Sequence, residues 1–294
     1  MLTGVFTALP TPFLKDGSLD TKQLIKLVTA QLNAGIHGMV LLGTTAETPT
    51  LTETEKKTIL DTCVPLLKGK AQIIIGAGTN NTLTTLDNLK QVSAYKPDAA
   101  LVVTPYYNKP NPSGLIAHYK VAATAGVPLV MYHIPGRTGL TISAAVLDKL
   151  LAQIPQLVGI KECNYDMSQV TDTAVKYSNK LNYFCGNDEL LLQFLSVGAC
   201  GTISAAANVL APAFVKIYNL FNAGKTHEAF LLFTRIYPLV KACYYETNPT
   251  CIKYMLHQLG FGTATVRAPL GEISTENKTK IDQLLANTNK EFLI

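Results

Sequence analysis

The sequence predicts an α/β protein, a closed (β/α)₈ barrel (TIM barrel) with a C-terminal helical extension. Two observations favour this fold class. Short apolar runs alternate with amphipathic stretches from the first residues to about residue 205, which is the pattern of βα units on a parallel sheet. The first apolar run leads into Pro10-Thr11-Pro12 and not into the glycine-rich loop that usually opens a doubly wound sheet. Eight evenly spaced runs therefore predict a closed barrel.

The expected strands are these apolar runs, at residues 4–9, 38–42, 71–76, 99–103, 128–132, 157–161, 181–185 and 201–204. Two of the helices between them carry recognisable start signals. Asp20 precedes the helix expected at 21–33, and the capping box Thr52-x-x-Glu55 opens the helix expected at 52–68. Five more helices are expected at 82–95, 113–125, 143–154, 168–177 and 188–197.

Beyond residue 204 the alternation stops, and helices are expected at 212–222, 226–240, 248–259 and 275–293. One of them closes the barrel in this interpretation. We therefore expect a catalytic barrel over residues 1–224 and a helical extension over residues 225–294. The extension should pack on the barrel, because no Gly/Ser-rich or Pro-rich linker separates the two.

Composition excludes several classes of protein. Hydrophobic residues make up 48% of the chain and charged residues 15%, which is typical of a compact globular protein. The net charge of +5 comes from scattered basic residues that do not interleave with aromatic ones, so no nucleic-acid partner is expected. No apolar run approaches the roughly 20 residues that span a bilayer, and residues 1–10 do not resemble a signal peptide. We expect a soluble, cytoplasmic protein without a membrane partner.

The cysteines and histidines give no sign of a metal. The six cysteines are widely spaced and form no C-x-x-C pair, and the five histidines are dispersed. Reduced thiols and the absence of a bound metal are the expectations.

The run at residues 157–162 ends on Lys161, where the strand leaves the core. Loss of hydration there disfavours the charged amine and frees a lone pair that can attack a carbonyl, as a Schiff-base lysine does. A strand-end lysine is more commonly an ordinary cation that reaches to water. Taken alone, Lys161 leaves both interpretations open.

Other polar side chains follow the strands at the edge where a barrel places its catalytic groups. Thr44 and Thr45 can hold a carboxylate, Tyr107 and Tyr132 can relay protons, and Arg137 can grip a second carboxylate. Each also has an ordinary interpretation as a turn cap, a core aromatic or a surface ion pair. Their joint appearance favours the chemical interpretation, with a 2-oxo acid and another acid as substrates.

Four segments carry a resemblance to a known family: Gly43-Thr44-Thr45-x-Glu47, Thr104-Pro105-Tyr106-Tyr107-Asn108, Tyr132-x-Ile134-Pro135-x-Arg137-Thr138 and Gly159-Ile160-Lys161-Glu162. In this combination and order they resemble the dihydrodipicolinate synthase family of pyruvate-dependent class I aldolases. The similarity extends from Thr3 to Pro249. It implies condensation of pyruvate with L-aspartate-4-semialdehyde in lysine biosynthesis, without a metal or organic cofactor.

The resemblance also implies a role for each matching residue. Lys161 forms an imine with pyruvate, Tyr132 transfers protons through Thr44, and Tyr107 reaches in from a neighbouring subunit. Homo-oligomerisation is therefore expected, as a tetramer built from two dimers. The implied catalytic residues are Lys161, Tyr132, Thr44 and Tyr107, and the implied substrate-binding residues are Thr45, Arg137, Gly186 and Ile203.

The sequence departs from the family pattern at Ala46, where glycine is usual, and at His133, where asparagine is usual. A left-handed backbone at residue 46 would cost an alanine about 1 kcal/mol, and His133 titrates near neutrality in ordinary surroundings. At the position where lysine-sensitive members place a glutamate the chain has Thr84, and Lys56 adds a like charge. Weak or absent inhibition by lysine is the resulting hypothesis.

Two alternatives stay open at this point. A related aldolase would cleave N-acetylneuraminate or a 2-keto-3-deoxy sugar acid, although Arg137 suits a carboxylate better than a sugar hydroxyl. A non-catalytic barrel would bind a 2-oxo acid as a sensor by hydrogen bonds alone.

Overall fold

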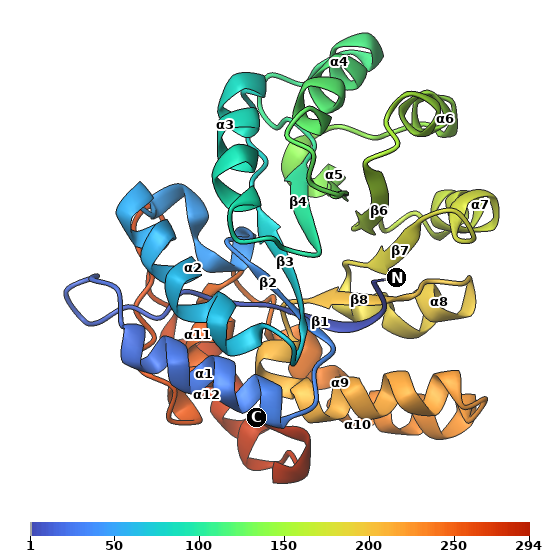
Figure 1. Cartoon of the computed structure of the whole chain (residues 1–294). Coiled ribbons are helices and arrows are strands. Elements are labelled where there is room, and N and C mark those ends of the chain that lie inside the picture. The colour runs from blue at the N-terminus through green and yellow to red at the C-terminus, as the bar shows by residue number, and fades with distance from the viewer. Residues whose placement is uncertain (1) are drawn as a thin grey trace. The chain divides into compact units, whose positions relative to one another are not determined.

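The computed structural model describes residues 2–294. Its eight strands follow one another in chain order in a closed barrel (Figure 1), so the predicted TIM barrel is confirmed. The strands are β1 (Gly4–Ala8), β2 (Gly38–Leu41), β3 (Gln72–Gly76), β4 (Ala99–Val103), β5 (Leu129–His133), β6 (Leu157–Glu162), β7 (Asn182–Cys185) and β8 (Gly201–Ser204).

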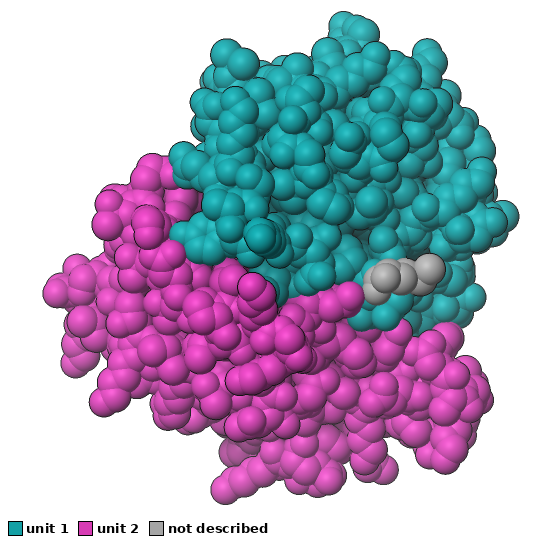
Figure 2. Space-filling model, in the orientation of Figure 1, with its two compact units in different colours: residues 1–3, 73–203 teal, residues 4–72, 204–294 magenta. Residues whose placement is uncertain are grey.

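The chain divides into two compact units, which Figure 2 colours separately. The first unit consists of residues 2–3 and 73–203, and the second of residues 4–72 and 204–294. Every helix after residue 204 belongs to the second unit, together with β1 and β2. The boundary expected at residue 224 stays a prediction.

In the first unit, helices α3, α4, α6 and α7 lie outside strands β3 to β7 (Figure 1). Parallel pairing sets Tyr132 of β5 opposite Lys161 of β6, and Lys161 opposite Phe184 of β7. The carboxyl ends of these strands therefore meet at one edge. The helices are α3 (Thr82–Ser93), α4 (Pro112–Ala123), α5 (Pro135–Thr138), α6 (Ala144–Gln153), α7 (Met167–Tyr177), η3 (Asp188–Leu190) and α8 (Leu191–Ser196).

In the second unit, the predicted helix starts are confirmed. The Asp20 side chain accepts a hydrogen bond from the Gln23 nitrogen, and Thr52 and Glu55 form the reciprocal capping box. Helices α9 and α10 pack side by side (Figure 1). The helices are α1 (Thr21–Asn33), η1 (Thr44–Ala46), η2 (Thr48–Thr50), α2 (Glu53–Leu67), α9 (Ala207–Asn222), α10 (Thr226–Ala242), α11 (Thr250–Gln258), α12 (Thr275–Ala286) and η4 (Lys290–Phe292).

Three predicted helices differ in extent from those observed. The helix expected over residues 212–222 forms the part of α9 after a kink: α9 begins at Ala207 and has non-helical angles at Leu210, because Pro212 lacks an N–H to continue the hydrogen-bond ladder. The stretch 188–197 is divided into η3 and α8, and the stretch 275–293 into α12 and η4. Two of these breaks coincide with local signals, Pro212 near the kink and the polar run Asn287-Thr288-Asn289 between α12 and η4.

No helix within residues 2–294 is long and apolar enough to cross a membrane. No disulfide joins two of these residues.

An ion pair in the second unit makes stability depend on acid pH. Arg267 donates hydrogen bonds to Glu55, and this contact lowers the pKa of Glu55 from 4.5 to about 2. A carboxylate whose pKa is depressed in the folded state contributes stability above its unfolded pKa, and that contribution is lost as the pH falls towards the folded pKa. In Glu55→Gln we expect the unfolding free energy to fall less steeply than in the parent protein as the pH is lowered from about 4.5 to 2. Urea unfolding at a series of pH values measures this slope.

Glu53→Gln is the matched control for this prediction. Glu53 lies in the same helical turn, but its side chain is 64% exposed and pairs with Lys56. The control should keep the pH dependence of the parent protein. An unchanged slope in Glu55→Gln would contradict the prediction.

Candidate active site

Lys161 and Tyr132 form the centre of the site in the first unit. The two residues face each other across β5 and β6, and the Lys161 Nζ lies 4.3 Å from the centroid of the Tyr132 ring. Lys161 is 7% exposed and Tyr132 is 6% exposed. A cation over an aromatic face is stabilised electrostatically, more strongly where water is excluded. The amine is therefore buried beside a phenol and does not reach freely to water.

The protonation of Lys161 differs from the expectation that burial would free its lone pair. Burial is the largest single influence and lowers the pKa of Lys161, but Tyr132, Cys163 and Asp188 together raise it by more. The net pKa lies above the ordinary value, so that expectation is wrong for the chain without substrate. A raised pKa favours the protonated amine, which must give up a proton before it attacks a carbonyl.

Gly186 lies just after β7, and Ile203 lies in β8. Gly186 follows β7 directly, and a Cβ at this position would lie 3.0 Å from Cε of Lys161 and would collide with Sγ of Cys163. Only glycine leaves the space beside the lysine open. Ile203 is fully buried in β8.

The threonine pair lies on a tight turn in the second unit. Thr44 and Thr45 begin η1, which is separated from β2 by Leu42 and Gly43, and Thr45 is 2% exposed. Ala46 completes the 3₁₀ turn, and the left-handed residue is the next one, Glu47, with φ of 56°. The strain considered for Ala46 therefore does not arise.

Within residues 2–294, no group of three or more His, Cys, Asp or Glu side chains is arranged to hold a metal ion. The polar groups described above are an amine, a phenol and hydroxyls, which suit covalent and acid–base chemistry.

The comparisons with known proteins identify the family. A family model described as the dihydrodipicolinate synthetase family matches residues 1–288. The 4-hydroxy-tetrahydrodipicolinate synthase of Methanococcoides burtonii is 38% identical over 296 residues, which cover 99% of this chain and 99% of that protein. The chain belongs to the dihydrodipicolinate synthetase family. It is therefore an enzyme.

Solved structures agree with this membership of the dihydrodipicolinate synthetase family. The 4-hydroxy-tetrahydrodipicolinate synthase from the thermoacidophilic methanotroph Methylacidiphilum fumariolicum superposes with a TM-score of 0.95 at 31% identity, covering 99% of this chain and 97% of that one. The chloride-inhibited dihydrodipicolinate synthase from Acinetobacter baumannii, complexed with pyruvate, has a TM-score of 0.94 at 33% identity, covering 97% and 98%.

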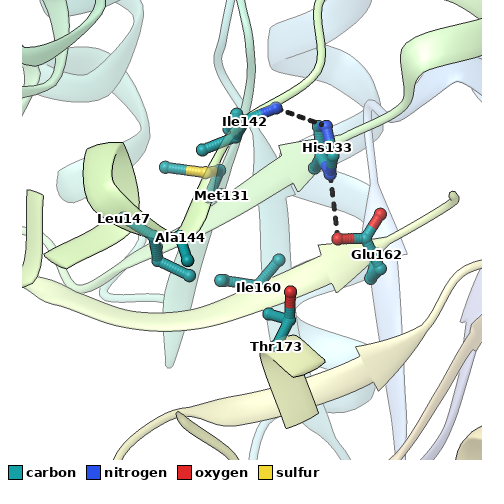
Figure 3. Close-up of a pocket in the computed structure, with 8 residues that line it drawn as sticks. All are labelled: Met131, His133, Ile142, Ala144, Leu147, Ile160, Glu162 and Thr173. Atoms are coloured by element: carbon teal, nitrogen blue, oxygen red, sulfur yellow. Dashed lines mark hydrogen bonds and ion pairs between the residues drawn. The ribbon is translucent and has the colours of Figure 1, made fainter. Parts of the chain in front are cut away.

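His133, where the resemblance led us to expect asparagine, lies on the face of the sheet away from Lys161. Successive side chains of a strand point to opposite faces, so His133 and Glu162 lie on the face opposite to Tyr132 and Lys161. His133 Nδ1 lies 2.8 Å from Glu162 Oε2, and the Ile142 nitrogen donates to Nε2 at 3.2 Å (Figure 3). Because Nε2 accepts a hydrogen bond from the Ile142 N–H, Nδ1 is the ring nitrogen that donates to Glu162.

A small pocket borders this histidine–glutamate pair (Figure 3). Its volume is about 10 Å³, which is the space of one water molecule. His133 and Glu162 thus form a buried hydrogen-bonded pair between β5 and β6. The pocket is lined by Met131, His133, Ile142, Ala144, Leu147, Ile160, Glu162 and Thr173.

Two predicted site residues of the dihydrodipicolinate synthetase pattern lie at the surface of the single chain. Arg137 is an exposed residue of α5. Tyr107 is 90% exposed and has φ of 70°, a left-handed conformation that is uncommon for a residue with a Cβ. The structure therefore buries Lys161, Tyr132 and Thr45 but leaves Arg137 and Tyr107 accessible.

Sequence reasoning missed two residues of the C-terminal region that contact the threonine turn, Asn248 and Lys253. The Thr247-Asn248-Pro249 segment matched the family pattern, but no sequence signal connects it with residues 44–47.

Proposed function

We propose that this enzyme condenses pyruvate with L-aspartate-4-semialdehyde to give 4-hydroxy-tetrahydrodipicolinate, a step of lysine (diaminopimelate) biosynthesis. The observation that carries the proposal is the buried Lys161 amine against the Tyr132 ring at the strand ends of a chain of this family. The names of its relatives and the pyruvate bound to the Acinetobacter baumannii enzyme support it. A cytoplasmic location is part of the same proposal.

In this mechanism Lys161 carries the substrate covalently. The deprotonated amine attacks the keto carbon of pyruvate, and loss of water leaves an imine. The imine withdraws electrons, so the methyl group gives up a proton and becomes an enamine carbon. That carbon forms a bond to the aldehyde carbon of the semialdehyde. The amino group of the semialdehyde then attacks the imine carbon, closes the ring and releases Lys161.

The other residues move protons and hold carboxylates in this proposal. Tyr132 lies against the Lys161 amine and is the proton carrier. Thr44 and Thr45 hold the pyruvate carboxylate with hydroxyl and main-chain N–H groups, and Gly186 and Ile203 line the substrate space. Holding two reactants together in one site lowers the activation barrier, by up to about 7–11 kcal/mol in favourable model systems.

Tyr107 completes the proton relay from a neighbouring subunit in this proposal. Its 90% exposure and left-handed backbone fit a residue that is held by contacts outside its own chain. The enzyme is accordingly proposed to be a homo-oligomer, a tetramer made from two dimers.

A turnover comparison tests the reaction. Purified enzyme is given pyruvate with aspartate semialdehyde, and separately N-acetylneuraminate and 2-keto-3-deoxy sugar acids. Faster turnover of the sugar acids would refute the proposal in favour of the related aldolases. Borohydride with pyruvate tests the sensor alternative, because only an imine adds mass at Lys161.

Arg137 is expected to select the second substrate. A guanidinium holds a carboxylate through two parallel hydrogen bonds, and pyruvate binding at Lys161 does not require this contact. We expect Arg137→Leu to raise KM for the semialdehyde by on the order of 10²-fold, the loss of a charge-assisted pair, and KM for pyruvate by less than about threefold. Arg235→Leu, a change to an arginine on α10, is the control. Equal effects on both substrates would contradict this role.

A further inference from the structure

The turn that carries Thr44 and Thr45 is held by residues from the far end of the chain, all within the second unit. Asn248 Nδ2 donates a hydrogen bond to Thr45 Oγ1 at 3.0 Å. Lys253 Nζ of α11 pairs with Glu47 Oε1 at 2.7 Å. The main-chain N–H of Arg267 donates to Glu47 Oε2 at 2.8 Å. The C-terminal region therefore contacts both the hydroxyl of the turn and the residue that ends it.

The contact from Asn248 determines how the Thr45 hydroxyl can act. A hydroxyl has one proton to donate and two lone pairs that accept. The Asn248 amide N–H occupies a lone pair of Oγ1, so the proton of Thr45 points away from Asn248. A carboxylate only accepts hydrogen bonds. Asn248 thus presents the threonine as a donor, which is the role that an anionic ligand requires.

The contacts to Glu47 fix the backbone beneath this hydroxyl. Glu47 adopts a left-handed conformation, which a residue with a Cβ adopts only when surrounding contacts compensate. The Glu47 and Lys253 side chains are 1% and 3% exposed, and the Lys253 Nζ also lies 4.1 Å from the centroid of the Phe13 ring. Thr11, in the loop after β1, donates from Oγ1 to the Ala46 carbonyl at 2.8 Å and so also stabilises this turn.

We propose that Asn248 is a positioning residue for the pyruvate carboxylate: it orients the Thr45 hydroxyl as a donor, on a turn that the Lys253–Glu47 pair keeps in place. This inference rests on the proposed function, in which Thr45 binds that carboxylate. Asn248 does not touch the reacting atoms in this role and acts only through Thr45.

A double-mutant cycle tests the proposal. We expect Asn248→Ala and Thr45→Val each to raise the pyruvate concentration for half-maximal borohydride trapping by about tenfold, the value of a hydrogen bond to a charged group. KM for the semialdehyde should change by less than about twofold. Because both changes remove the same hydrogen-bonded unit, the double variant should be no weaker than Thr45→Val. Additive effects, or an unchanged pyruvate dependence in Asn248→Ala, would overturn the inference.

An isosteric variant separates orientation from packing and covers the case in which Asn248→Ala does not fold. In Asn248→Asp the new carboxylate accepts the Thr45 proton, so pyruvate binding should be weaker than in Asn248→Ala. A role in packing alone predicts the opposite order. Asn277→Ala is the control, because Asn277 donates to Glu246 on the same extension without contact to the turn.

Failure of the two proposals can be told apart in the same assay. If the parent protein traps no pyruvate at all, the proposed function is wrong. If it traps pyruvate and the Asn248 variants behave like the parent, only the positioning role is wrong.

Discussion

Lys161→Ala is expected to lower kcat/KM by about 10⁴-fold or more, because the variant loses the amine that forms the imine and holds pyruvate in place. Borohydride and pyruvate should add no mass to this variant. Lys161→Arg should be equally inactive, since the guanidinium keeps the positive charge over Tyr132 but provides no nucleophile at neutral pH. The rate of semialdehyde consumption and intact-protein mass measure both outcomes.

The control for this prediction is Lys176→Ala. Lys176 lies on α7 with 48% of its side chain exposed, paired with Asp148. Its removal should leave turnover and trapping at the parent level. Residual imine formation in Lys161→Ala would show that a different amine carries pyruvate. The assignment of Lys161 as the imine-forming residue would then be wrong.

Lys253→Met is expected to have the largest effect on stability, a loss of about 3–5 kcal/mol of unfolding free energy. Burial lowers the pKa of Lys253 to about 8, while the charge of Glu47 opposes this shift. The side chain is therefore mostly protonated at neutral pH and paired with Glu47. Its removal leaves the Glu47 carboxylate buried without this partner, and methionine cannot replace the hydrogen bond. Denaturant unfolding at neutral pH measures the loss.

Two further variants make this result specific. The double variant Glu47→Gln/Lys253→Met removes both charges and should recover most of the lost stability. Lys57→Met breaks the Lys57–Asp61 pair, whose side chains are 71% and 49% exposed, and should cost less than about 1 kcal/mol. A Lys253→Met protein as stable as Lys57→Met would show that the buried pair contributes nothing.

The fold could be predicted because its signals are local. Each strand is a short apolar run, and its helices begin at caps such as Asp20 and Thr52 that are readable within four residues. The predicted bounds were wrong near breaks, at the kink by Pro212 and at the polar residues around 287, where the expected helix was carried through the break.

The identities of the candidate site residues could be predicted from the sequence. The surroundings that set their pKa values and contacts could be predicted less well. The position of Lys161 at the end of β6 follows from the apolar run before it. The direction of its pKa shift does not, because it depends on Tyr132, Cys163 and Asp188 around the amine. The sequence also did not show that the left-handed residue is Glu47 and not Ala46, or that His133 pairs with Glu162. Both depend on how the neighbouring residues pack.

The sequence by itself determined the order of the strands and which chemical groups stand at their carboxyl ends, because periodicity and capping act over a few residues. Only the tertiary structure decided what holds those groups. Asn248 and Thr45 are 203 residues apart in the chain, and Lys253 and Glu47 are 206 apart. Contacts over such separations arise from packing and leave no local pattern. That is why the turn that presents Thr44 and Thr45 shows its supports only in the folded chain.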